Sequence, residues 1–158
     1  MDIGLLRESF ARIETQKDAF AEKFYTTLLE EYPAMRAFFD GVDLKRQQTS
    51  LLATLLAMLN EAEHGAELRE LFRRLGQRHN ARQIGAEYYP AFGQVLLETL
   101  ARYDPAWTPE LRATWAAALE QCVRFMMESY HPEATVYRVQ ISPTRRPRTS
   151  PSSSSAKG

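Results

Sequence analysis

Cysteine and strand-forming patterns are the scarcest features of this sequence. Its 158 residues include one cysteine, Cys122, which excludes an internal disulfide framework and a zinc cluster of cysteine thiolates. Runs in which Val, Ile or Thr alternate with polar residues are also missing, apart from TVYRVQI at residues 135–141. Because such runs are typical of β-strands, their scarcity predicts an all-α protein.

Long apolar runs are missing too. No stretch approaches the roughly 20 apolar residues that a membrane-spanning helix requires. The N-terminal segment MDIGLLRESF is acidic and amphipathic, unlike a secretory signal peptide. We therefore expect no membrane span and a cytoplasmic protein.

Basic and acidic residues are equal in number over the whole chain but are distributed unevenly along it. Residues 131–158 contain five of the 20 basic residues and one of the 20 acidic residues, so residues 1–130 have a net charge of minus four. With this slight negative charge, residues 1–130 show no basic surface of the kind that binds nucleic acid. The basic tail is expected to be a solvated segment, with contact to an anionic surface as the alternative.

The length and the hydrophobic fraction of 44% fit one domain with a sizeable core. We expect this domain over residues 1–131, followed by a linker and a disordered tail rich in Ser, Pro and Arg over residues 132–158. The segment TVYRVQI in this tail is either a remnant linker or a docking site.

Six or seven amphipathic helices are predicted from apolar residues that recur every three or four positions. Thr15 is predicted to cap the second helix and Thr108 the last, where Pro109 and Glu110 suit the first turn. The expected ranges are 2–14, 16–31, 44–62, 66–79, 87–103 and 109–131, with a short phenylalanine-bearing turn at 34–40.

His79 is the candidate metal ligand. Leu68, Phe72, Leu75 and His79 recur at spacings of four, three and four, which places the imidazole on the apolar face of a helix. An aromatic-rich helix follows after a break at residues 80–85. A histidine near a helix end, covered by such a helix, suits a metal whose other ligands come from a planar cofactor. The alternative is an ordinary core histidine.

The segment LGQRHNARQIGAEYYPAFGQVLLETL resembles the proximal segment of bacterial single-domain globins and of the globin domain of flavohaemoglobins. In that family the helix carrying the haem-ligating His is followed ten residues later by a Tyr and then by a G-x-x-LL-x-TL helix. The matching residues are His79, Tyr89, Gly93, Leu96, Leu97, Thr99 and Leu100. The resemblance covers roughly residues 3–130. It implies a globin fold in which six to seven helices sandwich a haem b, with His79 as the iron ligand.

The segment FYTTLLEEYPAMRAFF resembles the distal segment of the same family, in which a Tyr points at the bound gas and a final Phe packs against the porphyrin. The matching residues are Tyr25, Pro33 and Phe39. A phenol at this place donates a hydrogen bond to a partly negative oxygen in a dry pocket, which slows its release. The alternative for Tyr25 and Phe39 is a role in the core alone.

The family also has a distal Gln and an apolar distal Leu. Its interval of twenty-eight residues between that Leu and the proximal His is met by Leu51 and His79, which places the Gln at Gln47. Gln48 would point about 100° away around the helix. A Gln in place of a His leaves the sixth coordination site open, and a Tyr/Gln pair suggests high oxygen affinity.

The proximal pattern of flavohaemoglobins is only partly met. There a Tyr and a late Glu make the imidazole more anionic, which favours O–O bond chemistry. Tyr89 matches the Tyr, but the Glu position falls on Tyr130, and the nearest acid, Glu128, lies two residues earlier. The alternative partner for the His79 N–H is the carbonyl of Leu75, a residue that is also expected to line the haem.

The resemblance implies a globin that reversibly binds oxygen, nitric oxide and carbon monoxide, for oxygen transport or nitric oxide detoxification. If it acts as a nitric oxide dioxygenase, Tyr25, Gln47 and Tyr89 are the candidate catalytic residues. A separate reductase is then expected, because the sequence lacks Gly-rich nucleotide-binding motifs. The alternative function is a haem-based gas sensor or a helical module that docks a partner through its tail. The oligomeric state is left open.

Overall fold

The computed structural model describes residues 2–130 and 145–147. This part of the chain consists of six α-helices and two 3-10 helices, and it contains no β-strand. The elements are α1 (Ile3–Glu14), α2 (Lys17–Glu31), η1 (Pro33–Phe39), α3 (Leu44–Glu61), α4 (Gly65–Ala81), η2 (Ala86–Tyr88), α5 (Tyr89–Tyr103) and α6 (Pro109–Met127). The predicted all-α class is confirmed. No helix in these ranges is long and apolar enough to cross a membrane.

The linker and tail predicted for residues 132–158 lie outside the described residues, except for residues 145–147. These three residues lie against the C-terminal end of α2. Arg145 forms ion pairs with Glu31 and Glu98, and the backbone N–H of Arg146 donates to the Glu31 carbonyl at 2.8 Å. Arg145 of the basic tail therefore contacts acidic side chains of its own chain.

Two predicted helix caps have different outcomes. Thr108 caps α6, because its hydroxyl accepts a hydrogen bond from the Leu111 N–H at 3.1 Å. The cap predicted at Thr15 is wrong. Its hydroxyl instead donates to the Arg12 carbonyl at 3.0 Å, and α2 begins only at Lys17. A threonine at a helix end can bond back to the preceding turn as readily as it caps the next helix.

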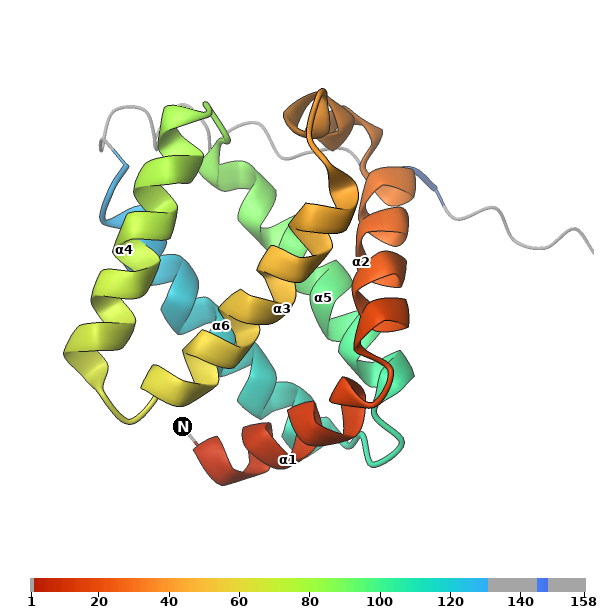
Figure 1. Ribbon diagram of the computed structural model, residues 1–158, viewed down its shortest axis with the longest axis vertical. Coiled ribbons are helices and arrows are strands. Elements are labelled where there is room, and N and C mark those ends of the chain that lie inside the picture. The colour runs from red at the N-terminus through yellow and green to blue at the C-terminus, as the bar shows by residue number, and fades with distance from the viewer. Residues whose placement is uncertain (1, 131–144, 148–158) are drawn as a thin grey trace, which may run out of the picture.

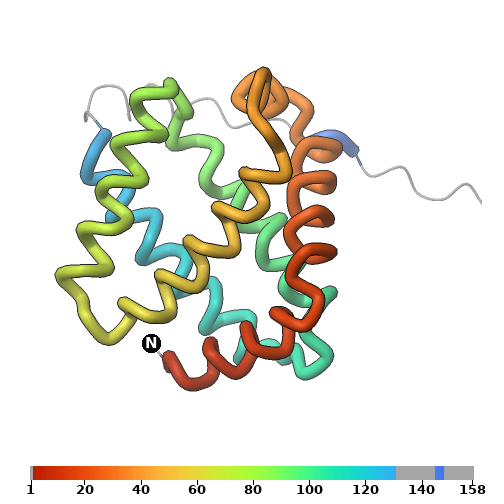
Figure 2. Tube along the Cα trace, viewed as in Figure 1, coloured from red at the N-terminus to blue at the C-terminus, as the bar shows by residue number. Residues whose placement is uncertain are grey.

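The helices form two crossing layers. α3 lies diagonally across the molecule with α5 and α6 behind it, and α4 stands beside α3 (Figure 1). α4 packs mainly on α6, whereas α2 packs on α5 and α3. From the short connection at residues 62–64, α3 and α4 diverge (Figure 2). The N-terminal end of α3 and the C-terminal end of α4 are consequently set apart at the same end of the molecule.

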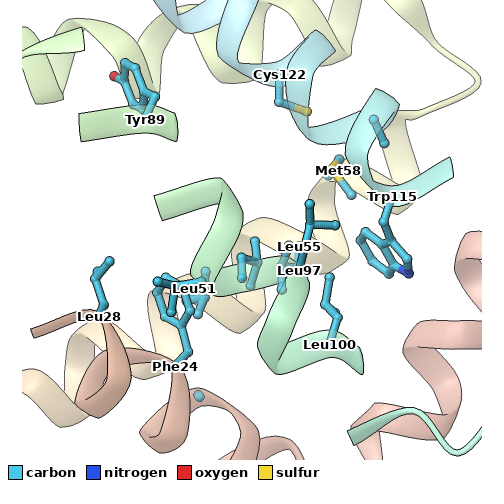
Figure 3. Packing of buried hydrophobic residues seen from close by; sticks show 14 of the residues in the cluster. Phe24, Leu28, Leu51, Leu55, Met58, Tyr89, Leu97, Leu100, Trp115 and Cys122 are labelled. Atoms are coloured by element: carbon cyan, nitrogen blue, oxygen red, sulfur yellow. The ribbon is translucent and has the colours of Figure 1, made fainter. Parts of the chain in front are cut away.

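Large apolar side chains from all six α-helices fill the space between the layers. Trp115 of α6, Leu100 of α5 and Phe24 of α2 are fully buried (Figure 3). Each such side chain contributes roughly 1.5–3 kcal/mol when it leaves water. Apolar residues that recur every three or four positions in the helices are buried, as the predicted amphipathic helices require: Leu6, Phe10, Ile13, Ala21, Phe24, Tyr25, Leu28, Leu51, Leu55, Leu59, Leu68, Phe72, Leu96, Leu100, Leu111, Trp115, Cys122 and Met126.

A buried carboxylate ties α1 to the C-terminal end of α5. Asp104 is 2% exposed and accepts hydrogen bonds from the Arg12 guanidinium at 2.6 and 2.9 Å, from the Ser9 hydroxyl at 2.6 Å and from the Ala106 N–H at 2.9 Å. The indole N–H of Trp115 donates in turn to Ser9. Burial acts to raise the pKa of Asp104, but the hydrogen bonds from Arg12 and Ser9 outweigh it and lower the pKa. The carboxylate therefore stays charged inside the fold.

The backbones of α4 and α6 come into direct contact at Gly76. This residue is buried, and a Cβ atom placed on it would overlap the carbonyl group of Met126, 2.7 Å from its carbon atom. Only a hydrogen atom fits between the two backbones at this crossing. Gly76 thus sets the depth at which α4 sits, three residues before His79.

Replacing Gly76 with alanine should lower the free energy of unfolding by about 1–3 kcal/mol, because the methyl group must push the backbone of α6 away. Urea titration measures this loss. Gly93→Ala is the matched control, since a Cβ on Gly93 meets nothing within 4 Å and alanine suits a helix interior better than glycine does. Equal stability of the two variants would contradict the close approach.

Candidate functional site

His79 lies in the last turn of α4, and its imidazole is half-buried. Leu68 and Phe72, on the same face of the helix, are buried, and Leu75 is half-buried. The apolar spacing of the sequence therefore places His79 at the inner edge of the core, as predicted.

Three side chains and one carbonyl form a continuous hydrogen-bonded row from His79. Its Nδ1 lies 3.1 Å from the hydroxyl oxygen of Tyr89, and this oxygen lies 2.8 Å from the hydroxyl oxygen of Tyr130. The Tyr130 hydroxyl then donates to the backbone carbonyl of Ile84 at 2.7 Å. Of the two partners considered for the His79 N–H, the structure has Tyr89 at Nδ1 rather than the carbonyl of Leu75.

The turn between α4 and α5 positions Tyr89. After α4 ends at Ala81, Gln83 adopts a left-handed conformation with φ of 61°, and the Ile84 N–H donates back to the His79 carbonyl at 3.0 Å. The 3-10 helix η2 follows and leads directly into α5, whose first residue is Tyr89. This reversal brings the first side chain of α5 against the last turn of α4.

Tyr130 comes from a turn and not from a helix. The last helix was expected to reach residue 131, but α6 ends at Met127, and the Tyr130 N–H donates to the Met127 carbonyl at 3.0 Å. The Ser129 hydroxyl anchors this turn to α4 by donating to the Arg73 carbonyl at 2.7 Å. Tyr130 contacts Tyr89 in the structure, and its inward direction depends on this turn.

Glu128, the acid nearest to that position, is not part of the row. Its carboxylate pairs with Arg69 of α4 at 3.0 Å on the protein surface. Tyr130, by contrast, is 6% exposed and Tyr89 is 7% exposed. The group in contact with Tyr89 is therefore a buried phenol and not a carboxylate.

The protonation of these groups follows from their surroundings. Burial, helped by the positive charges of Arg78 and Arg82, lowers the pKa of His79 to about 4. Burial and the contact with Tyr130 raise the pKa of Tyr89. At neutral pH the imidazole is accordingly uncharged and has one lone pair available, the form in which histidine binds metals.

A second group of predicted residues lies where α2, η1 and the start of α3 meet. Tyr25 of α2 is buried, and its hydroxyl donates to the backbone carbonyl of Gln47 at 3.4 Å. The ring of Phe39 lies edge-on to that of Tyr25, with centroids 5.6 Å apart. Burial raises the pKa of Tyr25 to about 12, so its hydroxyl keeps its proton at neutral pH.

Gln47 and Gln48 differ in what they face. Both are half-buried in the first turn of α3. Gln48 lines an open pocket of about 260 Å³ together with Tyr25 and Arg36, whereas Leu51, one turn after Gln47, is buried. Gln47 therefore shares a helix face with Leu51, whereas Gln48 faces the pocket that Tyr25 also lines.

The predicted residues thus form two groups on diverging helices. His79 and Tyr89 belong to the end of α4 and the start of α5. Tyr25, Gln47 and Phe39 belong to the region where α2, η1 and α3 meet. These regions adjoin the separated ends of α3 and α4 (Figure 1). A ligand that reached both regions would meet the imidazole of His79 in the first and the phenol of Tyr25 in the second.

A comparison with protein families gives the family of this chain. The globin family model matches residues 22–126, a range that runs from α2 into the last turn of α6. This chain belongs to the globin family.

Curated relatives of this globin are flavohemoproteins. The chain is 27% identical to one from Pseudomonas aeruginosa over 138 residues, covering 85% of the chain and 34% of that protein. It is 31% identical to one from Pseudomonas putida over 125 residues, covering 75% of the chain and 31% of that protein. The chain therefore spans about a third of the length of these relatives.

A solved structure resembles this globin over most of its length. It is a crystal structure of a Pseudomonas aeruginosa protein described as structurally highly homologous to a human hemoglobin, with a TM-score of 0.71 and 24% identity. The match covers 81% of this chain and 97% of that protein. At this identity the likeness establishes the fold.

Membership of the globin family implies haem as the prosthetic group, and the residues around His79 fit its iron. The imidazole is neutral, and its Nδ1 is held by Tyr89, so Nε2 is the nitrogen left for a metal. An imidazole oriented by a hydrogen bond through its other nitrogen is the usual form of a histidine ligand.

The haem-free protein should lose stability as the pH falls from about 6.5 to about 4. In this range the unfolded chain takes up a proton on His79 and the folded chain does not, so stability rises with pH. The lowered pKa corresponds to about 3–4 kcal/mol. Urea titrations of the wild type and His79→Gln at several pH values isolate this contribution. Parallel pH profiles for the two proteins would contradict it.

Proposed function

We propose that this globin binds haem b through Nε2 of His79 and uses it for reversible binding of oxygen and related diatomic gases. The observation that carries the proposal is the 3.1 Å contact between Nδ1 of His79 and the Tyr89 hydroxyl, which orients a neutral imidazole at the end of α4. Haem held through His79 would supply an iron centre able to bind diatomic gases.

Apolar side chains on both sides suit a porphyrin. Leu75 lies one turn before His79 and would contact the proximal face. Leu51 of α3 and Phe39 of η1 would contact the distal face, next to Tyr25. Such contacts exclude water, which strengthens each remaining hydrogen bond in the site.

Tyr25 is the proposed hydrogen-bond donor to the gas, with Gln47 beside it. The raised pKa of Tyr25 keeps its proton available, and its present acceptor, the Gln47 carbonyl, is 3.4 Å away. A hydrogen bond of that length is weak, so the hydroxyl can turn to a better acceptor at small cost. A partly negative oxygen is such an acceptor.

A second candidate function is nitric oxide dioxygenation, in which nitric oxide, oxygen and one electron yield nitrate. The similarity to flavohemoproteins over the globin portion supports it, and it would require a reductase, proposed here as a separate protein. The phenol of Tyr130 next to Tyr89, in place of a carboxylate, favours reversible binding instead. A phenol makes the imidazole less electron-rich than the carboxylate that the flavohaemoglobin pattern has at this position.

The first test is haem binding itself. Purified wild-type protein reconstituted with haem should show a Soret band and form a ferrous carbonyl complex, and His79→Ala should lose both. His64→Ala is the matched control, because His64 is exposed and precedes α4 at its opposite end. A His79→Ala protein with the wild-type spectrum would contradict the assignment of the iron ligand.

The second test concerns the distal hydrogen bond. Tyr25→Phe should raise the oxygen dissociation rate by about 10- to 100-fold, because a hydrogen bond worth about 1.5–3 kcal/mol is lost. Stopped-flow displacement of oxygen by carbon monoxide measures the rate. Tyr103→Phe removes a hydroxyl that donates to the Ala19 carbonyl and should leave the rate unchanged. An unchanged rate in Tyr25→Phe would remove Tyr25 from the site.

A further inference from the structure

We propose that Tyr130 is a positioning residue for His79, which acts through Tyr89 to hold the imidazole proton on Nδ1 and the lone pair on Nε2. This inference rests on the proposed haem site. It concerns a hydroxyl that does not itself reach the imidazole, because Tyr89 stands between them.

The direction of the hydrogen bonds follows from counting hydrogens. A backbone carbonyl has none, so the 2.7 Å bond between Tyr130 and Ile84 uses the single hydroxyl hydrogen of Tyr130. The 2.8 Å contact between the two phenols then uses the hydrogen of Tyr89. The 3.1 Å contact with His79 is left to the hydrogen on Nδ1.

The Ile84 carbonyl is therefore the group that sets the direction of the whole row. Ile84 is itself fixed, because its N–H donates to the backbone carbonyl of His79 at 3.0 Å. The row leaves the imidazole at Nδ1 and returns to the backbone of the same residue through Ile84. With both phenols over 90% buried, water has little access to replace a missing member.

Tyr130 also decides how strongly the row polarises the imidazole. Each donor in a hydrogen-bonded chain strengthens the next one, so Tyr130 makes the Tyr89 oxygen a better acceptor for the Nδ1 proton. Its own acceptor is a neutral carbonyl. The imidazole is therefore held firmly in one tautomer with only modest anionic character.

Tyr130→Phe tests, in the haem-free protein, whether Tyr130 controls the tautomer of His79. In the haem-free wild type, nitrogen NMR of His79 should show the tautomer protonated on Nδ1. In Tyr130→Phe the Tyr89 hydrogen loses its acceptor and can turn toward Nδ1, so the form protonated on Nε2 should appear. Tyr103→Phe should leave the spectrum unchanged. A wild-type imidazole protonated on Nε2, or a spectrum unaffected by Tyr130→Phe, would overturn the inference.

The haem-loaded protein tests whether Tyr130 acts through Tyr89. Tyr130→Phe should lower the iron–histidine stretching frequency in the resonance Raman spectrum of the deoxy ferrous protein. Haem transfer to an excess of a competing apoprotein should become about 10-fold faster. In a Tyr89→Phe background the same change should leave the stretching frequency where Tyr89→Phe alone puts it, because the two residues act in series.

The outcomes separate the inference from the haem proposal. A wild-type protein that takes up no haem would defeat the proposed function. A wild-type protein that binds haem through His79, with the same stretching frequency in Tyr130→Phe, would overturn only the role of Tyr130. An equal shift in both backgrounds would mean that Tyr130 supports the local fold and not the orientation of His79. Thermal unfolding of each variant verifies that it is folded.

Discussion

The hydrogen bond between Nδ1 of His79 and Tyr89 is the interaction on which the proposed chemistry depends. It joins the last turn of one helix to the first residue of the next, so the orientation of the imidazole depends on the chain reversal between them. It also depends on the direct backbone contact between α4 and α6 at Gly76. If α4 stood further from α6, the turn that carries Tyr130 would no longer meet Tyr89.

The two sides of the proposed site differ in how their polar side chains are held. On the proposed proximal side, the half-buried imidazole of His79 and two buried phenols form hydrogen bonds in a fixed order that ends at a backbone carbonyl. On the distal side, Tyr25 has one long hydrogen bond and aromatic neighbours. A rigid support on one side and an adjustable donor on the other suit a site that holds a cofactor permanently and a small ligand transiently.

Periodicity and caps were enough to predict much of the fold. The apolar stripes gave the helices within a few residues, and the four, three and four spacing put His79 at the edge of the core. The family resemblance supplied Tyr25, Gln47 and Tyr89. The direction of Tyr130 could not be predicted, because it depends on where α6 ends and on a bond from Ser129 to the backbone of another helix. Thr15 shows the same limit, since two local bonds of similar energy compete for one hydroxyl.

The ion pair of Asp104 with Arg12 limits where this domain can be shortened or fused to another protein. α1 precedes the range matched by the globin family model, which makes it look like an optional extension. Yet a version shortened past Arg12 would remove both side chains of α1 that bind the Asp104 carboxylate, Arg12 and Ser9, and with Ser9 the acceptor of the Trp115 indole N–H. Shortened proteins and fusions should therefore be joined ahead of Asp2, so that the first helix remains intact.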